Sequence, residues 1–61
     1  MSQITEKELS AISDLLTVEQ NLIAKYKHYA ANTGDTALKA HYEQIAATHQ
    51  LHFDALYVNL K

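Results

Sequence analysis

Residues that interrupt helices are almost absent from this sequence. It has no proline, and its single glycine, Gly34, lies in the segment Asn-Thr-Gly-Asp at the middle of 61 residues. Glycine and proline are the residues that destabilise a helix interior most. We therefore predict an all-α chain in one domain, residues 1–61, with helices over about 6–32 and 36–60 and a turn over 33–35.

Capping residues stand at the expected helix starts. Thr5 precedes the first helix and Glu8 follows three residues later, which is the spacing of a capping box. Asp35 can cap the second helix with its carboxylate. Gly34 suits the left-handed position that often follows a helix end.

Apolar residues recur in steps of three and four along both expected helices, which predicts one apolar seam on each. The seam has gaps at Glu19 in the first helix and at His49 and His52 in the second. The apolar seam residues are Leu9, Ile12, Leu16, Ile23, Tyr26 and Ala30, then Leu38, Tyr42, Ile45, Leu56 and Leu60.

Folding the chain back at Gly34 aligns these two seams in an antiparallel hairpin. In such a hairpin, two residues whose numbers add to 68 lie at the same level. Glu19 therefore faces His49, and Tyr26 faces Tyr42. The carboxylate of the first seam therefore meets the imidazoles of the second about halfway along each helix. This arrangement is typical of a helical bundle with one polar layer in its core.

A second apolar column runs beside the seam. A two-helix hairpin covers one seam by itself, so this column would remain in contact with water unless another chain covered it. We therefore expect a homodimer of hairpins that forms a four-helix bundle with twofold symmetry. The column consists of Leu15, Leu22 and Tyr29 in the first helix and Ala46, Phe53 and Leu60 in the second.

Two interpretations of Glu19, His49 and His52 stay open. A carboxylate and two imidazoles are suitable ligands for zinc or iron, so the three residues are candidate metal ligands. The same side chains could instead satisfy one another in a polar layer that fixes the register of the helices.

Charge and composition argue against several other functions. The formal net charge is −2 and no basic patch is present, so we expect no nucleic-acid partner. No apolar run approaches the ~20 residues of a membrane span, and the polar start does not resemble a signal peptide. No serine or threonine is placed with a base and an orienting acid, and no cofactor motif occurs, so we do not expect an enzyme.

Two segments carry a resemblance to a known family. The stretches LTVEQNLIAKYKHYA and GDTALKAHYEQIAATHQLHFDAL resemble the small ferritin-like proteins of the spore coat protein F type, over about Thr5 to Leu60. The shared features are Glu19, a Tyr-Ala pair ending the first helix, an Asp-x-x-Leu-Lys opening of the second, and an Ile-Ala-x-x-His-Gln-x-His stretch.

The resemblance implies a structural or assembly protein of sporulation. It would be located in the cytoplasm or the spore coat and could pair with other spore coat proteins. Glu19, His49 and His52 match the ferritin-like half-site, but His49 stands where that motif has a second glutamate. Each chain thus offers one carboxylate, which favours zinc or a redox-silent iron over an oxygen-activating pair of irons.

Overall fold

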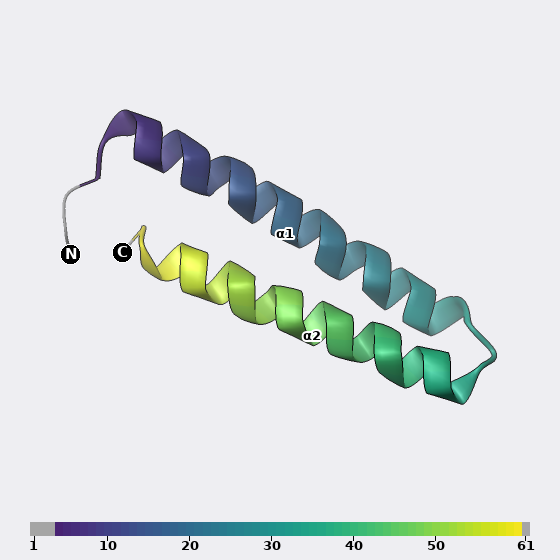
Figure 1. The fold of residues 1–61 in the computed structure, drawn as a ribbon. Coiled ribbons are helices and arrows are strands. Elements are labelled where there is room, and N and C mark those ends of the chain that lie inside the picture. Colours follow the sequence, from purple (N-terminus) through teal and green to yellow (C-terminus); the bar gives the residue numbers. More distant parts are fainter. Residues whose placement is uncertain (1–3, 61) are drawn as a thin grey trace.

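Two long helices make up the structure. The computed structural model describes residues 4–60, and within them α1 spans Glu6–Asn32 and α2 spans Thr36–Val58. The helices pack side by side and run in opposite directions, so that the start of α1 and the end of α2 lie at the same end of the molecule (Figure 1). The predicted all-α hairpin is confirmed, and no strand occurs between residues 4 and 60. Neither helix combines the length and the apolar character that a bilayer span requires.

The capping box predicted at the start of α1 is present. The Thr5 hydroxyl accepts a 3.0 Å hydrogen bond from the backbone N–H of Glu8, and the Glu8 carboxylate accepts one of 2.9 Å from the backbone N–H of Thr5. The hydrogen bond from the Thr5 backbone, followed by that from its side chain, lowers the pKa of Glu8 below its ordinary value. This local motif fixes where α1 begins.

The turn contradicts the expectation for Gly34. No residue between 4 and 60 has a positive φ, Gly34 included, because the chain leaves α1 in an extended conformation at Thr33, with φ −93° and ψ 140°. The Thr33 hydroxyl accepts a 3.2 Å hydrogen bond from the backbone N–H of Asp35. Asp35 is also extended, and its carboxylate caps α2 by accepting a 2.9 Å bond from the N–H of Leu38, as predicted. The reversal is thus distributed over three residues and needs no left-handed one.

The apolar seam is buried or half-buried at all but two of its residues. Ile23 and Ala30 are buried, but Leu9 and Leu38 are 44% and 43% exposed, so the expectation that they lie in the seam core is wrong. Helix α2 ends at Val58, two residues earlier than expected, so no helical residue of α2 lies level with Leu9. By the register expected from the sequence, Leu38 is level with Ala30, which has a small side chain.

The second apolar column is covered more than expected on α2. Ala46 is the most buried residue described, at 3% exposure, because its methyl group lies in the groove between the helices beneath longer neighbours. Phe53 and Leu60 of the same column are half-buried. On α1 the column is open to solvent, with Leu15 48% and Tyr29 42% exposed. The α1 column therefore has exposed apolar surface, as do Leu51 and Val58 of α2.

Candidate metal centre

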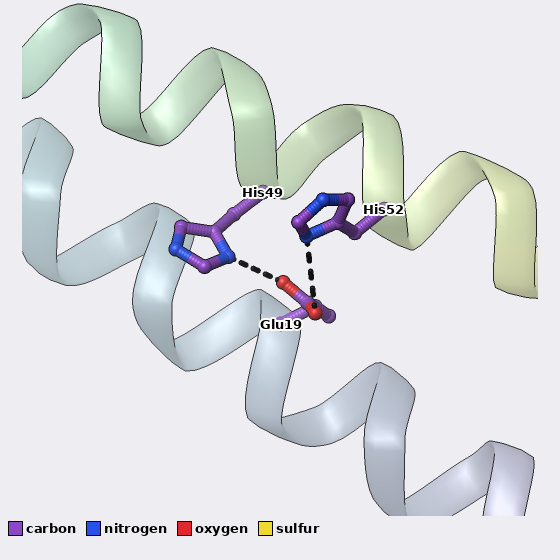
Figure 2. Close-up of side chains that lie close together, drawn as sticks. All are labelled: Glu19, His49 and His52. Carbon is purple, nitrogen blue, oxygen red and sulfur yellow. Dashed lines mark hydrogen bonds and ion pairs between the residues drawn. The ribbon is translucent and has the colours of Figure 1, made fainter.

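Glu19 projects from the middle of α1 between two imidazoles of α2. Its Oε1 lies 2.7 Å from Nδ1 of His49 and its Oε2 lies 3.6 Å from Nδ1 of His52. Both rings turn the same nitrogen toward the carboxylate, and their second nitrogens point away from it (Figure 2). The level pairing predicted from the sequence brought these three side chains together correctly.

The three side chains differ in burial. The side chain of Glu19 is 15% exposed and that of His49 is 22% exposed, whereas that of His52 is 54% exposed. A step of three residues leaves His52 rotated by about 60° around the helix axis from His49. The prediction that His52 lies on the seam is therefore only partly correct, because its ring stands at the solvent edge of the seam.

Tyr26 supports the ring of His49 from the side of the turn. The two rings are nearly parallel, with 10° between their planes and 6.3 Å between their centroids. The ring centroids of Tyr26 and Tyr42 are 6.1 Å apart. The Lys25 ammonium lies 5.5 Å from the centre of the Tyr26 ring. The Tyr26 ring therefore lies beside the ring of His49. The seam pattern predicts Tyr26 only as a core residue, and the available signal for this contact was its place seven residues after Glu19 on the same helix face.

The geometry suits a metal ion after a small adjustment. One ligand atom from each of Glu19, His49 and His52 can be chosen so that all lie within 4.8 Å of one another. In tetrahedral coordination with zinc bonds of 2.0–2.1 Å, ligand atoms lie about 3.3 Å apart. A metal ion would thus open the 2.7 Å contact slightly and draw His52 inward. Elsewhere between residues 4 and 60, no other group of three such side chains lies this close.

The same contacts also satisfy the polar atoms without a metal. A carboxylate can only accept, so the His49 Nδ1–H donates the 2.7 Å hydrogen bond to Glu19. Among residues 4–60, no buried side-chain nitrogen or oxygen lacks a hydrogen-bond partner. Metal binding through Nδ1 would replace this proton, so the polar layer and the metal site are two states of the same residues.

The remaining histidines lie away from this cluster. His41 is exposed on α2. His28 is exposed on α1, where its carbonyl accepts a 2.7 Å hydrogen bond from the side chain of Asn32. Neither joins Glu19, so both can serve as controls for substitutions at the cluster.

Comparison with known proteins identifies no relative. The chain matches no protein-family model, and no curated protein or solved structure is similar to it. The class that the fold and the site define is a helical hairpin with one inter-helix Glu/His cluster.

Proposed function

We propose that this chain binds one divalent transition-metal ion through Glu19, His49 and His52. The observation that supports this most directly is the convergence of three ligand-type side chains from two helices, with ligand atoms within 4.8 Å. All three lie at gaps in the apolar seam of the sequence, and two of them, Glu19 and His49, are mostly buried. Glu19 and His49 are paired there by their hydrogen bond, whereas His52 approaches the carboxylate only to 3.6 Å, and a ligand function accounts for its place beside them.

Zinc and iron are the candidate ions. Imidazole nitrogens combined with one carboxylate suit both metals, and neither calcium nor magnesium favours nitrogen ligands. One carboxylate per chain does not provide the bridging oxygens of a di-iron centre. The proposed site therefore holds a single ion without oxygen-activating chemistry.

Metal analysis of the purified protein tests the proposal. Protein prepared without a tag or a chelator is expected to hold close to one ion per chain, and His52→Leu is expected to lose it. The matched control is His41→Leu, which removes an exposed histidine from the same helix and should leave the metal content unchanged. Wild-type protein without metal, and without affinity for added zinc, would reject the proposal in favour of the metal-free polar layer.

A homodimer that forms a four-helix bundle is our second proposal. A compact protein of 6.9 kDa exposes about 4,000 Å², whereas this chain exposes 4640 Å². Its radius of gyration is 14.4 Å, compared with about 10.5 Å for a compact chain of this length. Large apolar side chains are among the exposed ones: Leu9, Leu15, Val18, Tyr29, Leu38, Leu51, Tyr57 and Val58.

The face of α1 that carries Leu15, Val18 and Tyr29 is the proposed dimer surface. These residues lie on one side of the helix at helical spacing, together with half-buried Leu22. Sedimentation equilibrium is expected to give a dimer for the wild type and a monomer for Val18→Glu. Leu51→Glu places the same charge at a residue of α2 that is 69% exposed, outside this surface, and should remain dimeric. A wild-type monomer at all concentrations would contradict the dimer.

The role in the spore coat is the broadest part of the functional hypothesis. It depends on the resemblance of the sequence alone, so a ferritin-like, coat-associated assembly protein stays a prediction. A structural role of this kind needs the dimer surface but not the metal. Dimerisation of a metal-free His52→Leu variant would therefore favour assembly as the main function of the chain.

A further inference from the structure

We infer that the ion at Glu19, His49 and His52 keeps one coordination position open to solvent and binds a small monoanion there. The inference rests on the proposed metal-binding function and adds the class of ligand that the site takes from solution. Its first support is the number of protein ligands. Structural zinc sites have four, whereas sites that bind an external ligand have three and leave the fourth position open.

The chain provides three ligands and no fourth. Within residues 4–60 the cluster contains Glu19, His49 and His52 but no further histidine, aspartate or glutamate, and the sequence has no cysteine. The ring that stacks beside His49 belongs to Tyr26, whose phenol is a poor ligand for zinc compared with imidazole or carboxylate. The coordination of a bound ion is thus incomplete within one hairpin.

The open position faces the solvent edge of the seam. Glu19 and His49 are mostly buried, whereas more than half of the His52 side chain is exposed, at 54%. The His52 ring stands at a large angle to the His49 ring, with 86° between their planes, and turns its Nδ1 toward the carboxylate (Figure 2). In the single hairpin a ligand can therefore reach the ion from the His52 side without displacing either helix.

The charge of the site selects an anion. A divalent ion held by one carboxylate and two neutral imidazoles retains one net positive charge in a partly buried place. A second carboxylate in the cluster would cancel it, but none is present. A monoanion with a nitrogen or oxygen donor, such as azide or acetate, neutralises the site and completes four-coordination.

Cobalt(II) provides a direct test because its visible absorption reports its ligands. The protein is loaded with one equivalent of Co²⁺, and sodium azide is then added at constant ionic strength. We expect the cobalt absorption to change saturably, with one azide per ion. His41→Leu, which leaves the cluster intact, should give the same titration, and sodium perchlorate should give no change.

The outcomes separate this inference from the function on which it rests. Co²⁺ that binds with a spectrum insensitive to azide would overturn the open position. Failure of Co²⁺ to bind, measured by equilibrium dialysis, would overturn the proposed metal site and the open position together.

Discussion

The carboxylate of Glu19 accepts a 2.7 Å hydrogen bond from Nδ1 of His49, across 30 residues of sequence and from the opposite helix. This bond ties the middle of α1 to the middle of α2, where the apolar seam is interrupted on both sides. It holds a carboxylate and an imidazole together where a metal ion can replace the proton of the hydrogen bond. Substitutions at His49 and Glu19 separate its contribution to stability from its contribution to metal binding.

Removing the imidazole of His49 should destabilise the metal-free hairpin. His49→Leu leaves the mostly buried carboxylate of Glu19 without its closest partner, which costs about 1–3 kcal/mol. The double variant Glu19→Leu/His49→Leu replaces the pair with apolar side chains and should recover most of this loss. Urea unfolding monitored by circular dichroism measures both changes. Equal stability of His49→Leu and the wild type would show that the hydrogen bond has no role in folding.

Zinc should raise the melting temperature of the wild type. An ion that binds only the folded state raises the free energy of unfolding by about 2.7 kcal/mol when the free metal concentration is about 100 times Kd. Glu19→Gln keeps the size of the side chain but removes the anionic ligand, so its melting temperature should respond weakly to zinc. Thermal denaturation with and without zinc gives the comparison. A similar rise in both proteins would indicate that zinc binds elsewhere.

Replacing Gly34 with alanine should stabilise the hairpin. Gly34 has no positive φ, and a Cβ added there would meet no atom within 4 Å. The substitution reduces the conformational entropy of the unfolded chain without strain in the folded one. The free energy of unfolding should therefore rise by about 0.4–1 kcal/mol. Chemical denaturation measures the difference. A loss of stability would mean that Gly34 requires the left-handed conformation that the sequence suggested.

The start of α1 should loosen in acid. Hydrogen bonds from Thr5 lower the pKa of Glu8, so the carboxylate holds its proton less tightly in the folded chain than in the unfolded one. The stabilisation is therefore fully present above the ordinary glutamate pKa and is lost as pH falls through the lowered value. NMR titration of the Glu8 side chain measures this pKa. Thr5→Val removes the hydroxyl and should return the pKa part of the way, and an unchanged value would contradict the capping box as its cause.

Local chemistry made much of the hairpin predictable from the sequence. The capping pairs at Thr5 and Asp35 act within four residues, so the starts of both helices followed directly from their residue types. The periodic seam and the central turn then set the register that brought Glu19 level with His49. Periodicity carries this information because helical geometry is nearly constant along the chain.

Other features depended on how closely the helices approach and how they are rotated. The sequence located the turn at Gly34 but did not reveal the backbone path through it. Because Thr33 is extended, the turn needs no residue in the left-handed conformation. The burial of Ala46 depends on long neighbours from both helices, which no pattern in one helix specifies. The contact between the rings of Tyr26 and His49 likewise depends on how the two helices pack against each other.

The sequence by itself determined the two helices, where they begin, and which acid meets which imidazole, because short-range hydrogen bonds and a constant helical repeat govern all three. The tertiary structure alone decided that His52 stands at the solvent edge while Glu19 and His49 are sheltered. That difference comes from the rotation of α2 against α1, which results from packing along the whole hairpin and cannot be read at any single residue.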